Sequence, residues 1–452
     1  MVHNDTRAAA VRFARHERVP YASFEVGLSK ISPERTPETV DAGDEIVTEA
    51  RGGPPTTASR PHHQVLLIPG FFGFGNLGEL SYFNGVREQL AESFARAGVD
   101  VTVTEVKTLP TASIRVRAAR VLEALVRVAE TSAGPIHVIG HSTGGLDARL
   151  AIAPTAALPT TVRLRDYSRI HTLVSVCCPH FGTPIASFFG STLGKPVLRL
   201  VARYWMWLLR RGRIPIALLL RVGYFFVRLR DPWRKRKSTF DELYEKLFRD
   251  LGDERRLELI QFLDAVSSDQ ALVFQLTPAG CDLLNACTAD PAVHYGSVVA
   301  RAHRPTFRTF LRSLRDLYAQ IVHPVFAGLH FIAARGEAVP VLPTPEQSTA
   351  LVRAYGEVPL PRDSDGVVPT LSQVWGDLVH AANADHLDVV GQFGRTDTAA
   401  WGGDWLPSYS AFTNEGFAAL WSDVATYAIE KSRAPKQSTP MLLEGTKEGA
   451  TS

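Results

Sequence analysis

The chain has 452 residues, of which 45% are hydrophobic and 21% charged, and its formal net charge is +3. This composition is that of a globular protein and excludes a fibrous or low-complexity chain. The near balance of charges gives no indication of a nucleic-acid partner. The N-terminus lacks the pattern of a signal peptide, and no apolar run is long enough to span a bilayer, so we expect a cytoplasmic location.

The first organised part of the chain alternates apolar runs with helical patterns. Polar, irregular segments are predicted before it, over 1–60, and at the end of the chain, over 433–452. The predicted strands are 64–69, 99–106, 135–139 and 170–177, and the predicted helices are 83–97, 112–131 and 146–153. Such alternation predicts an α/β fold over 61–186, with a mostly parallel central sheet and helices on both faces.

The alternation stops where the chain becomes apolar and basic. We interpret 187–290 as a large helical cap or lid insertion and 291–432 as the second part of the core. That second part opens with a strand-like run over 293–299 and a helical, Arg-rich stretch over 306–332. Within the insertion, 198–237 combines aromatic and aliphatic runs with arginines, which is typical of helices at a lipid interface. An ordinary apolar cap explains the same pattern equally well.

Ser142 stands at the centre of Gly140-His-Ser-Thr-Gly144, directly after a predicted strand and before a helix. In this context G-x-S-x-G exposes a serine nucleophile, because its glycines permit a sharp turn. A glycine-rich helix start without chemistry is the alternative, and the strand–turn–helix context argues against it. Acyl transfer also needs donors for an oxyanion. We expect these to be the backbone N–H groups of Thr143 and of Phe71, in the loop after the first strand.

These segments resemble the bacterial true lipases of the Pseudomonas and Burkholderia type. The resemblance rests on Pro69-Gly-Phe-Phe-Gly73, on Gly140-His-Ser-Thr-Gly-Gly-Leu-Asp-Ala-Arg149 and on Cys178-Pro-His-Phe-Gly-Thr-Pro184. The first motif of that family normally begins with His-Gly, and here Pro69 replaces a histidine that helps to order the loop. The resemblance implies an α/β-hydrolase fold, a lid over an acyl pocket and the hydrolysis of carboxylic esters.

The resemblance also assigns an acid and a base to the nucleophile. Asp365, in Ser-Asp-Gly-Val-Val-Pro, and His386, in Asp-His-Leu-Asp, match the late motifs of the family and are 21 positions apart. They follow Ser142 in the order Ser, Asp, His that this fold requires. Asp363 is an alternative acid, but it lacks the following glycine. His380 is an alternative base, but it stands in a helix-like stretch.

The family carries a structural calcium ion, and no cofactor for the reaction itself is expected. One of its ligands is the Asp two residues after the catalytic His, which corresponds to Asp388. The second corresponds to Pro343, where the nearest carboxylate is that of Glu346, so the ligand pattern is half met. The alternative is that Asp388 only hydrogen-bonds the loop around His386.

The sequence therefore predicts a serine hydrolase that acts on carboxylic esters, as a lipase or esterase on apolar acyl esters. An acyltransferase or phospholipase with the same triad is the first alternative. A non-catalytic protein of the membrane surface is the second, and the ordered presence of all three triad residue types argues against it. The expected partner is a lipid or other ester substrate, with peripheral lipid contact through 198–237.

Overall fold

The computed structural model describes residues 62–71, 82–154, 156–164, 166–191, 271–286, 293–314, 319–335, 342–394 and 404–434. The strands are β1 (His62–Ile68), β2 (Asp100–Glu105), β3 (Ile136–His141), β4 (Ile170–Val176), β5 (His294–Ala300) and β6 (Asp377–Ala382). The helices are α1 (Val86–Arg96), α2 (Ile114–Thr131), α3 (Thr143–Ile152), α4 (Pro184–Gly190), α9 (Ala271–Gln275), α10 (Pro278–Asn285), α11 (Phe307–Ser313), α12 (Ala319–Ala333), α13 (Pro345–Tyr355) and α14 (Asn414–Arg433). Short 3₁₀ helices span Tyr167–Arg169, Thr370–Gln373 and Asp388–Val390.

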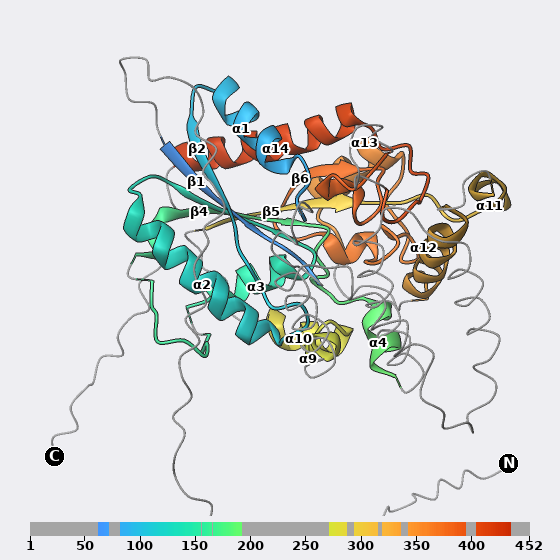
Figure 1. Ribbon diagram of the computed structural model, residues 1–452, viewed down its shortest axis with the longest axis horizontal. Coiled ribbons are helices and arrows are strands. Elements are labelled where there is room, and N and C mark those ends of the chain that lie inside the picture. Colours follow the sequence, from blue (N-terminus) through green and yellow to red (C-terminus); the bar gives the residue numbers. More distant parts are fainter. Residues whose placement is uncertain are drawn as a thin grey trace, which may run out of the picture. The chain divides into compact units, whose positions relative to one another are not determined.

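The six strands form one sheet in the order β2-β1-β3-β4-β5-β6, and every neighbouring pair is parallel (Figure 1). The chain runs outward from β1 to β2 and then crosses back to β3, so the direction of strand addition reverses between β1 and β3. In open parallel sheets, ligands bind beyond the carboxyl ends of the strands at such a reversal. The loop after β1 and the turn after β3 therefore meet where this fold builds its sites.

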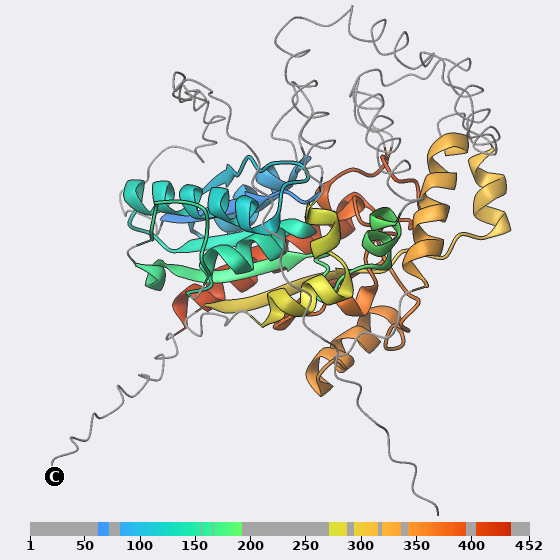
Figure 2. The same ribbon diagram turned by 90° about the horizontal axis from the view of Figure 1, so that it is seen from below.

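Helices cover both faces of the sheet (Figure 2). On one face, α1 and α14 pack together over a core that includes Leu90, Phe94 and Trp421. On the other, α2 and α3 pack over a second core. The amphipathic pattern of α2 explains its placement, because buried apolar side chains recur every three or four residues and Ser113 caps its first turn. This is the predicted α/β architecture, with a parallel central sheet and helices on both faces.

Two details of the prediction were wrong. The helix after Ser142 begins at Thr143, three residues earlier than expected, because the turn leads directly into the first helical turn. The stretch around His380 is not helical but forms β6, which pairs with β5 from Gly296 and Asp377 onward. A short apolar run does not by itself distinguish helix from strand, and here pairing with β5 decides.

Several predicted segments lie outside the described residues. These are 1–60, 198–237, all but the first two residues of 433–452, and most of the predicted cap 187–290. The described end of the cap, α9 and α10, packs against α4 and the core. In the described part of the chain, no helix is both long and apolar enough to cross a membrane.

A buried histidine pair joins the amino ends of β1 and β3, far along the strands from Ser142. His63 Nδ1 lies 2.9 Å from His137 Nε2, and His137 Nδ1 lies 2.8 Å from the Thr172 hydroxyl. Burial lowers the pKa of His63 to about 4 and the pKa of His137 well below its usual value. Both rings are therefore neutral in the folded chain at neutral pH.

This pair predicts a loss of stability in acid. Below pH 6.5 the unfolded chain protonates these histidines while the folded chain does not, so protons favour unfolding. We expect the free energy of unfolding, measured by urea denaturation, to fall between about pH 6.5 and about pH 4. A His137→Gln variant should show a shallower dependence over the same range, and an unchanged slope would contradict the assignment.

Candidate active site

Ser142 occupies a strained turn between β3 and α3. Its φ is 53° and its ψ −127°, a backbone conformation that residues other than glycine rarely adopt. The Ser142 N–H donates to Val176 O at 2.8 Å, which ties the turn to β4. A Cβ added at Gly140 would lie 2.5 Å from the Gly144 backbone, and one added at Gly144 would lie 2.3 Å from Ile68 O. Both glycines of the pentapeptide are therefore required by close packing.

The loop after β1 lies directly against Ser142. A Cβ added at Gly70 would lie only 2.6 Å from Ser142 Cβ. The Gly70 N–H donates to the Tyr82 hydroxyl at 3.0 Å, so it is already committed. The next N–H along the loop is that of Phe71, and the first residue of α3 is Thr143. Phe71 and Thr143, the two residues expected to donate to an oxyanion, therefore lie next to the contact between the loop after β1 and the turn that carries Ser142.

This close approach predicts a strong effect of Gly70→Ala. The added methyl group would push the loop away from Ser142, and a displacement of about 1 Å at a catalytic centre can cost about 10²-fold in rate. We expect kcat/KM for a p-nitrophenyl ester to fall by about that factor, with the thermal unfolding transition retained. Gly328→Ala is the matched control, because a Cβ there meets no atom within 4 Å. Equal activity of the two variants would contradict the prediction.

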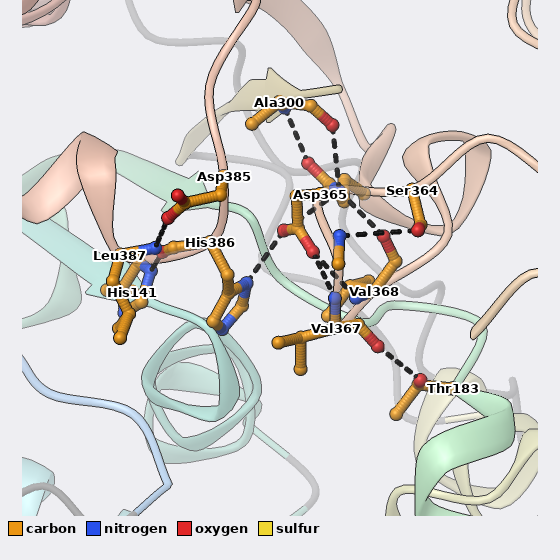
Figure 3. Close-up of polar contacts among 12 residues, drawn as sticks. His141, Thr183, Ala300, Ser364, Asp365, Val367, Val368, Asp385, His386 and Leu387 are labelled. Atoms are coloured by element: carbon orange, nitrogen blue, oxygen red, sulfur yellow. Dashed lines mark hydrogen bonds and ion pairs between the residues drawn. The ribbon is translucent and has the colours of Figure 1, made fainter. Parts of the chain in front are cut away.

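His386 and Asp365 form a buried pair (Figure 3). His386 Nδ1 donates to Asp365 Oδ2 at 2.7 Å, and the His386 N–H donates to Asp365 O at 3.0 Å. The other carboxylate oxygen, Oδ1, accepts from the N–H groups of Val367 and Val368 at 2.8 and 2.7 Å. The structure thus brings together the two side chains that the sequence predicts as acid and base.

Gln373 also holds the carboxylate, and sequence reasoning missed it. Its Nε2 donates to Asp365 Oδ2 at 3.2 Å, and its Oε1 accepts from the Ala300 N–H at 2.7 Å. The Ala300 N–H can only donate, so it fixes which end of the amide faces Asp365. Gln373 lies in a 3₁₀ helix and belongs to no motif, so the sequence offered no signal for it.

His141 links the loop after β1 to the loop of the base. Its Nε2 donates to His386 O at 2.9 Å, and its Nδ1 lies 2.7 Å from the Tyr82 hydroxyl. Because a carbonyl only accepts, Nε2 carries the proton. Burial lowers the pKa of His141 well below its usual value, so the ring is neutral and Nδ1 accepts the Tyr82 proton. A continuous hydrogen-bonded chain therefore runs from Gly70 through Tyr82 and His141 to His386.

The alternative acid and base lie in other interactions. Asp363 Oδ1 accepts from Arg304 at 2.8 Å, and its Oδ2 accepts from the Leu360 N–H at 2.8 Å. His380 Nδ1 lies 2.7 Å from Asp423 Oδ2, between β6 and α14. Neither residue replaces Asp365 or His386 in the structure.

A group of three carboxylates lies beside His386. Oxygens of Asp385, Asp388 and Asp404 lie within 4.8 Å of one another. Asp388 Oδ2 accepts from the Asp385 N–H at 2.8 Å and from the Ser410 hydroxyl at 2.6 Å. Burial raises the pKa of Asp385 to about 6 and that of Asp404 to about 8. Carboxylate oxygens this close together suit a hard divalent cation. Glu346, the nearest carboxylate to the expected second ligand position, is not part of this group and lies in the first turn of α13.

The chain is similar to one family model and to several solved structures. A family model described as "Putative serine esterase (DUF676)" matches residues 58–213, about a third of the chain, which include Ser142 but not Asp365 or His386. No curated protein sequence matches the chain. Among solved structures, the Staphylococcus hyicus lipase is 14% identical with a TM-score of 0.45, covering 82% of this chain and 96% of its own. Lipase 1 from Pelosinus fermentans is 15% identical with a TM-score of 0.44, and the match covers 83% of this chain and 100% of that lipase. EstA from Clostridium botulinum is 17% identical with a TM-score of 0.42, and the match covers 82% of this chain and 93% of EstA.

Proposed function

We propose that this chain is a serine hydrolase that cleaves carboxylic esters through a Ser-His-Asp triad and an acyl-enzyme. The observation that carries the proposal is the strained Ser142 turn packed against Gly70, joined through His141 to the buried His386–Asp365 pair. The match of the Ser142 segment to a serine-esterase family supports the same reaction. Backbone strain at a turn residue is common where that residue is the nucleophile.

The residues take the following roles in this proposal. The Ser142 hydroxyl attacks the ester carbonyl while His386 Nε2 accepts its proton and then passes it to the leaving alcohol. Asp365 holds the proton of His386 on Nδ1 and stabilises the imidazolium that forms. The N–H groups of Phe71 and Thr143 donate to the oxyanion of the tetrahedral intermediate. Water then attacks the acyl-enzyme by the reverse sequence, which releases the acid.

An apolar acyl group is the preferred substrate in this proposal. Phe71, at the oxyanion loop, and Val367, two residues after the acid, contact one apolar cluster. The cluster is formed by the buried residues Ile185, Phe189, Val273 and Ala333 of α4, α9 and α12. Apolar side chains at both sides of the reacting groups favour a hydrocarbon chain over a polar one. On this basis we propose a lipase or esterase of the bacterial true-lipase type, and the lipid contact expected through 198–237 lies outside the described residues.

Two measurements test the reaction. A fluorophosphonate probe should label the folded chain, and mass spectrometry should locate the label on Ser142. Hydrolysis of p-nitrophenyl esters from short to long acyl chains should then give the acyl preference, with long chains favoured. Absence of both labelling and hydrolysis would refute the proposal. Adding an acceptor alcohol distinguishes an acyltransferase, because a new ester would form in place of the free acid.

We also propose a structural calcium ion at the carboxylates of Asp385, Asp388 and Asp404. Calcium at about 100 times its Kd should raise the free energy of unfolding by about 2.7 kcal/mol, and EDTA should reverse the gain. Asp388→Asn should abolish this dependence, whereas Glu346→Gln should retain it. Thermal denaturation with and without calcium measures both. A gain that is the same in the Asp388→Asn variant would refute the site.

A further inference from the structure

Arg117 is a fully buried cation in the first turns of α2 that no motif pointed to. Its Nη2 donates to Pro69 O at 3.0 Å and to Gly70 O at 3.2 Å, and it reaches the Thr143 hydroxyl oxygen at 3.4 Å. Its Nη1 donates to Leu109 O. One guanidinium therefore contacts both segments that the proposed reaction uses to hold an oxyanion.

The contact with Gly70 O has a direct geometric consequence. The carbonyl of Gly70 and the N–H of Phe71 belong to the same peptide unit, which is planar and, like every described peptide bond, trans. In a trans peptide the C=O and the N–H point in opposite directions. A guanidinium that holds Gly70 O on one side therefore turns the Phe71 N–H to the other side. The Gly70 N–H, held by Tyr82, fixes the preceding peptide unit in the same way.

The second segment is held through a side chain. Thr143 supplies the other proposed donor from its backbone N–H, and its hydroxyl faces the same Nη2 atom of Arg117. The spacing of the two donors therefore depends on a single planar group. A lysine could not reproduce this arrangement, because its ammonium is one point of charge rather than a fork of five donors in a plane.

Asp147 holds the guanidinium at Nε and at Nη2, which lies 2.8 Å from Asp147 Oδ2. Arg117 Nε donates to Asp147 Oδ2 at 2.8 Å, and both side chains are fully buried. Burial raises the pKa of Asp147 to about 6, and the positive charge of Arg117 opposes that rise, so the pair is ionised at neutral pH. Among the described residues, Asp147 Oδ1 has no hydrogen-bond partner. The carboxylate therefore contributes little to its own segment beyond anchoring Arg117.

We propose that Arg117, anchored by Asp147, is a positioning residue that sets the direction and spacing of both oxyanion donors. The inference rests on the proposed ester hydrolysis and adds to it a residue outside the triad. It touches neither the substrate nor the reacting atoms, and it acts only on the peptide that carries the Phe71 N–H and on Thr143.

The test compares Arg117→Lys with Arg169→Lys. Arg169 also donates to three backbone carbonyls, those of Ala129, Ser132 and Gly134, but it does so away from Ser142. We expect Arg117→Lys to lower kcat by about 10²-fold with KM changed by less than about threefold. Its affinity for an alkyl boronic acid, whose adduct with Ser142 is tetrahedral and anionic, should fall by the same factor as kcat/KM. Arg169→Lys should lower the unfolding temperature without either change.

A second pair of variants covers a failure of Arg117→Lys to fold. Thr143→Val removes the hydroxyl but keeps the backbone donor, and Thr143→Ser keeps both. Thr143→Val should lower kcat and boronate affinity together, and by a larger factor than Thr143→Ser, which keeps the hydroxyl that faces Arg117. An active wild type whose kcat and boronate affinity are unchanged in Arg117→Lys, or equal in the two Thr143 variants, would overturn the role of Arg117 alone. A wild type that neither hydrolyses esters nor binds the boronate would overturn the proposed function as well.

Discussion

Replacement of Ser142 by alanine is expected to lower kcat for p-nitrophenyl ester hydrolysis by about 10⁶-fold. The hydroxyl is the proposed nucleophile, and an alanine side chain has no atom that could form the acyl-enzyme. The fold should persist, because alanine fits the space of serine and the Ser142 N–H bond to Val176 O does not involve the side chain. Single-turnover kinetics with long-chain and short-chain esters should show the loss for both.

The control is Ser168→Ala, since Ser168 is exposed and lies in the 3₁₀ helix before β4. It should retain wild-type kcat, KM and labelling by a fluorophosphonate. Both variants should give circular dichroism spectra and unfolding transitions like those of the wild type. Hydrolysis by Ser142→Ala at more than about a hundredth of the wild-type rate would remove Ser142 from the mechanism.

Most of the fold could be predicted because its signals are local. The strands β1, β3 and β4 are almost wholly buried, β2 alternates valine with threonine at the edge of the sheet, and helical patterns separate the four. The sixth strand was misread because His380 and its neighbours form a short edge strand, whose pairing with β5 is a long-range contact. The insertion 198–237 has a pattern that suits a lipid interface and an ordinary cap alike, and it lies outside the described residues.

The site could be predicted only where chemistry leaves a motif. Ser142, Asp365 and His386 stand in recognisable loops, and the structure joins the last two at 2.7 Å. Gln373 and Arg117 act on the same groups through single side chains on a 3₁₀ helix and on α2. Their roles depend on which elements the fold brings together, so no spacing in the sequence marks them. The same holds for Asp404, which joins Asp388 from a distant loop.

Replacement of Asp365 by asparagine is expected to lower kcat by about 10⁴-fold without unfolding the chain. Four N–H donors hold the carboxylate: two backbone N–H groups at Oδ1, and His386 and Gln373 at Oδ2. Backbone donors cannot reverse, so the asparagine oxygen stays with Val367 and Val368, and its NH₂ group turns toward His386. His386 Nδ1 must then accept, which moves the ring proton to Nε2. A ring protonated at Nε2 cannot take the proton of Ser142.

The matched control is Asp363→Asn, which makes the same substitution two positions away. Asp363 holds Arg304 and the Leu360 N–H and faces neither His386 nor Gln373, so its loss should cost stability but leave kcat within about threefold of the wild type. The difference between the two variants therefore separates the orientation of the histidine proton from the packing of the loop. If Asp363→Asn lowered kcat as much as Asp365→Asn, the loss would come from loop disorder, and Asp365 would not be the residue that fixes the tautomer of His386.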